Sequence, residues 1–179
     1  MPDNPLSQDM MKSIVSLTIE TYKEMREKDR KHEIDRKLHN TRLLLENYRS
    51  FISFDANAVY DAAKCNEDVY EILSLMSGNP SKEELYVESI KRSVGRTKLI
   101  IAHINRALES YKDYCVSSGK PEELRRYRII QTYYLDNEIV DPQTIADNEN
   151  IDISTVYKDI KEGIKRLTPR IFGVDGFRV

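Results

Sequence analysis

The longest regular pattern of hydrophobic and polar positions lies between Ser81 and Cys115. Its apolar positions alternate steps of three and four residues along one helical face. They are Val87, Ile90, Val94, Thr97, Ile101, Ile104, Leu108, Tyr111 and Cys115. Ser81, followed three residues later by Glu84, forms a capping box, so we expect a helix to begin there. The repeat predicts a coiled-coil-like seam, which either packs inside the chain or joins two copies as a homodimer.

An earlier segment, from about Met11 to Ile52, contains neither glycine nor proline. Its middle, "KEMREKDRKHEIDRKLHN", has few apolar positions and predicts a solvated helix, supported by acid–base pairs three and four residues apart. The end of the segment returns to helical spacing and predicts a buried stripe. Its members are Leu38, Thr41, Leu45, Tyr48 and Ile52. A further helical pattern runs from about Asp55 to Met76, so the chain predicts an all-α fold.

The sequence "SSGKP" at 117–121 marks the clearest boundary. We expect an N-terminal helical region over residues 1–118, which serves packing or oligomerisation. We expect a short tri-helical unit over residues 119–179.

Residues 143–167 of that unit read "QTIADNENIDISTVYKDIKEGIKRL" and match the spacing of a helix-turn-helix. Ala146 is small enough for two helices to meet there. Asn150 suits the left-handed turn that must follow. Ile151 closes the corner, and Val156 and Ile160 face the first helix. We expect Asp141, followed by Pro142, to cap the first helix and Ser154 to cap the second.

The second helix of this pair has two chemically different faces. At about 100° per residue, Val156, Ile160, Ile164 and Leu167 share one arc. The opposite arc holds Ser154, Lys158, Lys161 and Lys165, with Tyr157 at its edge. Lysines bind phosphates or guanine edges, so this face predicts contact with a DNA major groove. The alternatives are a lysine face that is merely solvated, or one that contacts protein.

The charge balance limits how strongly such a helix binds. The 179-residue chain has a net charge of −2, and neither predicted region is polybasic. Six acids lie on and around the first helix of the pair: Asp136, Glu138, Asp141, Asp147, Glu149 and Asp152. We therefore expect weak unaided DNA affinity and dependence on a dimer or a partner protein.

Other functional classes find little support. No apolar run is long enough for a membrane span, and the start lacks the order of a secretory signal, which favours the cytoplasm. Cys65 and Cys115 are expected to be reduced thiols. His32, His39 and His103 form no metal-binding pattern, and no phosphate loop or nucleophile motif suggests an enzyme or a cofactor.

The segments "STVYKDIKEGIKRL", "IFGVDG" and "LHNTRLLLENYRSF" together resemble the ArpU/RinA-like transcriptional regulators of phages and prophages of Gram-positive bacteria. The part from Pro121 to Leu167 also resembles the sigma-factor domain that reads the −35 promoter element. The resemblance implies an activator of late phage genes, such as those for packaging or lysis, in the host cytoplasm. It implies that the DNA-facing residues are Ser154, Thr155, Tyr157, Lys158 and Lys161.

A second hypothesis is an interaction protein without direct DNA contact. Its helices and the acidic surface of the C-terminal unit would bind RNA polymerase or another phage protein. A sigma-like factor that joins the polymerase lies between these two hypotheses.

Overall fold

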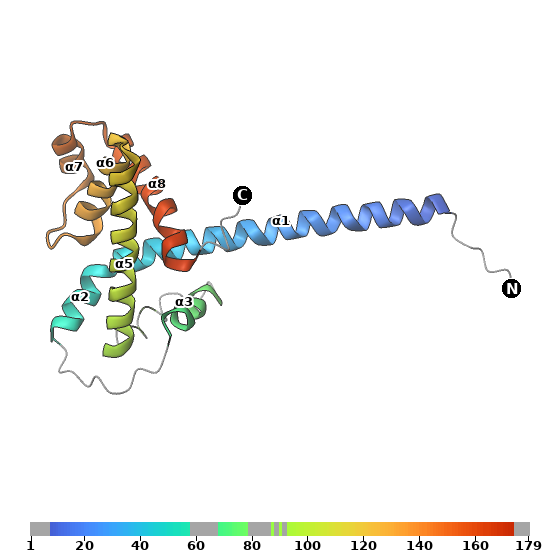
Figure 1. The fold of residues 1–179 in the computed structure, drawn as a ribbon, viewed down its shortest axis with the longest axis horizontal. Helices are drawn as coiled ribbons and strands as arrows, with labels where there is room; N and C mark the ends of the chain where they lie inside the picture. The colour runs from blue at the N-terminus through green and yellow to red at the C-terminus, as the bar shows by residue number, and fades with distance from the viewer. Residues whose placement is uncertain (1–7, 58–67, 79–86, 88–89, 91–92, 174–179) are drawn as a thin grey trace.

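The computed structural model describes residues 8–57, 68–78, 87, 90 and 93–173, and the described residues contain helices and no strands (Figure 1). This confirms the all-α prediction. The elements are α1 (Gln8–Glu46), α2 (Tyr48–Asn57), α3 (Val69–Gly78), α5 (Val94–Ser118), α6 (Pro121–Ile130), the π-helical turn η2 (Gln131–Leu135), α7 (Pro142–Glu149) and α8 (Ile153–Phe172). In this part of the chain, no helix has the length and apolarity that a membrane crossing needs.

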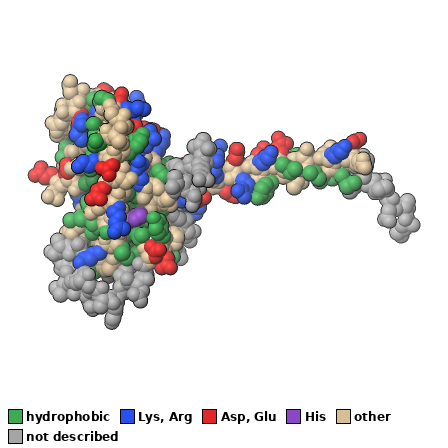
Figure 2. Space-filling model, in the orientation of Figure 1, with side chains coloured by type: hydrophobic (Ala, Val, Ile, Leu, Met, Phe, Trp, Pro, Cys, Tyr) green, Lys and Arg blue, Asp and Glu red, His purple; other side chains and the backbone are tan. Residues whose placement is uncertain are grey.

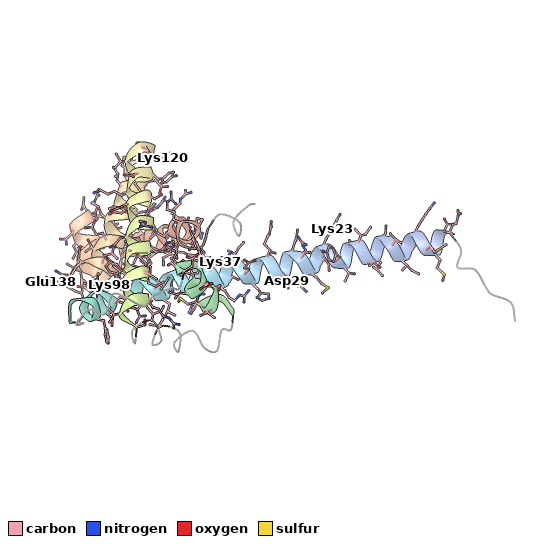
Figure 3. The ribbon with its side chains drawn as sticks, turned by 60° about the horizontal axis from the view of Figure 1, so that its bottom comes forward. Lys23, Asp29, Lys37, Lys98, Lys120 and Glu138 are labelled. Carbon is pink, nitrogen blue, oxygen red and sulfur yellow. The ribbon has the colours of Figure 1, made fainter. Side chains whose placement is uncertain are left out.

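Helix α1 is a long arm joined to a helical body. Its 39 residues extend over about 58 Å, and most of that length projects into solvent (Figure 1). Lys23 and Asp29 lie on the projecting part, and Lys37 lies near the body (Figure 3). The buried residues of α1 are Asn40, Thr41, Leu44 and Leu45. The prediction that a solvated helix is followed by a buried stripe is confirmed as far as Leu45.

The stripe departs from its predicted positions where α1 ends. The helix is interrupted at Asn47, and α2 begins at Tyr48. After this interruption Phe51 is fully buried, whereas Ile52 is 39 % exposed. The predicted burial of Ile52 is wrong, because one uninterrupted helical periodicity does not run through the break.

Helix α5 runs through the centre of the body and packs on α2, α3, α6 and α8. The residues of its predicted seam are buried within the chain: Thr97, Ile101, Ile104, Leu108, Tyr111 and Cys115. Cys115 is a free thiol, and Cys65 lies outside the described residues. Of the two alternatives for the Val87–Cys115 pattern, the structure shows packing inside the chain, which already fills this face in a single copy.

The helix predicted from Ser81 to Cys115 is interrupted at Ser93. This residue is extended, with φ −121° and ψ 111°, and its Oγ accepts a hydrogen bond from the Arg96 backbone N–H at 3.4 Å. Ser93 therefore caps a new helix that begins at Val94. The prediction of one continuous helix is wrong, because the local serine cap ends the first part although the apolar spacing continues. The predicted capping box at Ser81 lies outside the described residues.

Helix α5 ends at Ser118 and is followed by Gly119, whose φ of 63° is left-handed. The division into regions at residues 118 and 119 stays a prediction. Helix α8 then packs against α6, α7, α5 and the end of α1. The body-facing side of α8 is thus supported by both regions of the chain.

Candidate nucleic-acid interface

A tight turn joins α7 to α8. Asp141 caps α7, and its Oδ1 accepts hydrogen bonds from the backbone N–H groups of Gln143 and Thr144 at 3.0 and 3.1 Å. At the other end Asn150 has φ 54°, in the left-handed region, and the Ile151 N–H donates to the Ala146 carbonyl at 3.0 Å. This pattern is a Schellman motif, which reverses the chain directly after the helix. The local sequence therefore fixes how α7 leads into α8.

Helices α7 and α8 pack against each other through small and β-branched residues. Ala146 is 1 % exposed on α7, and Val156 and Ile160 are 0 and 5 % exposed on α8. Ile151, between the two helices, packs against the core. Ala146, Val156 and Ile160 are therefore buried and Ile151 is half-buried in the part of the chain where α7 leads into α8.

Asp152, rather than Ser154, caps α8. The Asp152 Oδ1 accepts the Ser154 backbone N–H at 2.7 Å, and the helix begins at Ile153. The prediction of Ser154 as the cap is wrong, because an aspartate two residues earlier takes that role. Ser154 consequently lies in the first turn of α8, where its side chain is exposed.

One face of α8 is buried and the opposite face is polar and exposed. Val156, Ile164 and Leu167 are at most 3 % exposed. The exposed face, called here the lysine face, consists of Ser154, Lys158, Lys161 and Lys165. At its edges Tyr157 is 55 % exposed and Thr155 is half-buried. The chain's own body leaves this face accessible.

The acids of α8 offset only part of the charge of the lysine face. Lys165 forms an ion pair with Glu162 at 2.6 Å. Lys158 and Lys161 form no ion pair within the described part of the chain. Asp159 turns inward and is 2 % exposed. Two cations of the lysine face therefore remain available to an anionic partner.

Asp159 belongs to an ion network that holds α6 against α8. Its carboxylate accepts hydrogen bonds from Arg125 Nε at 2.7 Å and Arg126 Nε at 3.0 Å. Glu123, 4 % exposed, accepts from Arg126 at 2.8 Å and from Arg166 at 3.3 Å. Because buried charges require partners, these arginines serve the fold.

The acidic first helix of the pair is also partly neutralised. Arg128 on α6 binds Glu149 on α7 through two hydrogen bonds, of 2.8 and 2.6 Å. This contact holds the pKa of Glu149 below its ordinary value of 4.5. Asp141 and Asp152 act as helix caps and keep their negative charge, because hydrogen bonds from Thr144 and Ser154 hold their pKa values below the ordinary value.

A groove of about 220 Å³ separates the lysine face from α1. Helix α1 contributes Leu38, His39 and Arg42 to its lining, and α8 contributes Lys161, Ile164 and Lys165. The Thr41 hydroxyl donates to the Thr168 hydroxyl at 2.9 Å and ties the two helices together beside it. Sequence reasoning missed His39 and Arg42, because only packing between distant segments places them beside the lysines.

The groove and the lysine face form one surface that carries lysines, an arginine and a histidine. Within the described residues, no cluster of three or more His, Cys, Asp or Glu side chains could hold a metal ion. No family model, curated protein or solved structure matches the chain.

Proposed function

We propose that α7, its turn and α8 form a helix-turn-helix that binds double-stranded DNA. The observation that carries the proposal is the lysine face, which stays exposed while the opposite face of α8 is core. In helix-turn-helix proteins the second helix enters the major groove, and its N-terminal residues contact base edges. The same placement here would direct Ser154, Thr155, Tyr157 and Lys158 into the groove.

We assign the other basic side chains of this surface, Lys161, Arg42 and Lys165, to contacts with the DNA phosphates. Lys161 borders both the lysine face and the groove that Arg42 and His39 line. Lysine and arginine side chains on the flank of a recognition helix bind phosphates and fix its register. Lys165 is expected to contribute less, because Glu162 already pairs with it.

The charges around this surface support modest affinity for a single copy. Asp147 is exposed, and Asp152 lies at the start of α8, where DNA would approach. Few phosphate contacts mean a small electrostatic contribution and a shallow dependence of affinity on salt.

The proposed role is transcriptional regulation in the cytoplasm of a bacterial host. The resemblance to ArpU/RinA-like regulators supports activation of late phage genes, and the sigma-like character of the C-terminal unit supports action at a promoter.

One observation favours the second candidate, a protein that binds RNA polymerase or a phage protein. Ile139 is 86 % exposed in the loop before α7, with Glu138 beside it and Asp141 two residues later (Figure 3 labels Glu138). A large apolar side chain framed by acids suits a basic protein surface.

Selection of genomic fragments by the purified full-length chain, read by sequencing, tests the proposal. We expect a recurrent sequence among the bound fragments, and affinity for it that falls as salt rises. The second candidate would be favoured if the bound fragments shared no sequence at any salt concentration and if the chain captured RNA polymerase even after nuclease treatment.

A further inference from the structure

The projecting part of α1, residues 8–33 and called here the arm, carries an uncovered apolar surface. Every arm residue is exposed. Eight large hydrophobic side chains among them are 49–66 % exposed: Met10, Met11, Ile14, Val15, Leu17, Ile19, Tyr22 and Met25. Figure 2 shows hydrophobic side chains gathered along one side of the arm. This surface is separate from the lysine face of α8.

Two threonines complete an apolar stripe along one side of the arm. This stripe is distinct from the buried one at the end of α1. The hydroxyl of Thr18 donates to the Ile14 carbonyl, and that of Thr21 donates to the Leu17 carbonyl, both at 2.8 Å. Because each hydroxyl proton is used within the helix, the threonines can be covered without stranding a donor. The stripe then runs through Met11, Ile14, Thr18, Thr21 and Met25, in alternating steps of three and four.

The extent of this surface exceeds what an isolated chain usually exposes. Seven of the eight hydrophobic side chains, all but Ile19, lie on one side of the helix and present on the order of 700 Å², close to the area that each partner contributes to a standard interface. The largest apolar patch of a typical monomer is about 300–600 Å². An isolated helix of this kind is also marginal in water, since packing supplies most helical stability. The arm is therefore suited to a partner helix.

We propose that the partner is a second copy of this chain, joined arm to arm in a short coiled coil. The stripe has the heptad spacing of a coiled-coil seam, and Val15, Leu17 and Tyr22 flank it. It ends after Met25, because the next seam positions are Lys28 and His32. The paired segment, from about Met10 to Met25, is thus confined to the arm and leaves both bodies outside it.

The polar side of the arm is compatible with self-association. Asp9, Lys12, Glu20, Lys23 and Glu24 mix both charge signs, so two arms need not repel each other. A helix that binds a lipid surface is typically rich in Lys and Arg on its polar face. The acids on this face favour a second copy over an anionic membrane.

This dimer differs in location from one formed through the Val87–Cys115 pattern, whose described residues are buried inside a single copy. It does not rest on the proposed DNA binding. If both hold, the dimer carries two lysine faces, and the second binding event gains from a high effective concentration.

Sedimentation equilibrium of the full chain across the micromolar range tests the proposal. Ile14→Glu/Met25→Glu places two charges in the stripe. The matched control, Ser13→Glu/Ser16→Glu, places two on the opposite side of the same helix. We expect the mass of two copies for the wild type and the control. For the stripe variant we expect association weakened about tenfold or more, with unchanged thermal unfolding of the body.

Several results would overturn the proposal. The proposal is wrong if the wild type has the mass of one copy at every concentration, or if the stripe variant associates as strongly as the wild type. Wild type that stays single but sediments with anionic phospholipid vesicles would assign the stripe to a membrane surface. Failure of DNA binding leaves the measured mass unchanged, so the two proposals fail separately.

Discussion

Thr41 and Thr168 form a buried hydrogen bond, 2.9 Å long, between α1 and α8, although 127 positions separate them in the chain. Both residues are 0 % exposed. The Thr168 hydroxyl in turn donates to the Ile164 carbonyl at 2.8 Å, and the Thr41 hydroxyl, which has one proton to share, also lies 2.9 Å from the Lys37 carbonyl. These two hydroxyls connect the buried end of α1 to the helix that carries the lysine face.

Thr41→Val and Thr168→Val should each destabilise the protein by about 1–2 kcal/mol, because each keeps the side-chain shape but removes one partner of the buried hydroxyl pair, and Thr168→Val also removes the hydrogen bond to Ile164. The two effects should couple by about 0.5 kcal/mol or more, since they share one interaction. Urea unfolding of the two single variants and the double variant measures this coupling. Strictly additive effects would show that the hydroxyls do not interact.

Gly163→Ala should destabilise the protein by about 1–3 kcal/mol, despite the better helix propensity of alanine. A Cβ at Gly163 would lie 2.6 Å from Cγ1 of Ile130, which is fully buried. Urea unfolding gives the cost, and the Ile130→Ala background is its control because it removes the opposing atoms. An equal cost in both backgrounds would exclude this close approach as the cause.

Glu149→Gln should lower stability at pH 7 by about 0.5–1 kcal/mol, the range of a partly exposed ion pair. The pKa of Glu149 lies below its ordinary value of 4.5, because Arg128 hydrogen-bonds the carboxylate. The stabilisation is therefore present above pH 4.5 and is lost as the pH falls through the folded-state pKa. Denaturation at a series of pH values should show the two proteins converging in acid. A difference independent of pH would contradict the ion pair.

Asp152→Asn should strengthen DNA binding roughly two- to tenfold, because it removes a negative charge at the start of α8 while asparagine still caps the helix. Fluorescence anisotropy with a selected duplex measures the affinity, and circular dichroism checks the helix content. Asp113→Asn makes the same charge change on an exposed residue of α5 and should leave affinity unchanged. Equal gains from both variants would mean that only net charge matters.

The sequence predicts features that depend on nearby residues. Asn150 adopts the left-handed conformation because short polar side chains tolerate it, and Asp141 caps α7 through adjacent backbone groups. The burial of Ala146 and Val156 follows from helical spacing alone. Local backbone sterics and periodicity are sufficient for these positions.

Other features depend on competition between local signals or on distant packing. Asp152 and Ser154 are both good caps, and spacing does not decide between them. The apolar residues keep the same spacing on both sides of Ser93, so the spacing does not predict that the helix is interrupted there. The inward turn of Asp159 and the placement of Arg42 beside Lys161 require α6 and α1 to pack on α8.

The most direct test of the proposed DNA-binding face is duplex affinity after removal of the two lysines that form no ion pair within the described residues. We compare Lys158→Ala/Lys161→Ala with Lys112→Ala/Lys120→Ala, which removes two exposed lysines outside α8. The first variant should lose affinity, and its slope of log affinity against log salt should become shallower by about one, because Lys161 is assigned to a phosphate and Lys158 to the groove, while the second stays near wild type. Equal affinities and slopes for both variants, with helix content intact, would contradict a DNA-binding role for the lysine face.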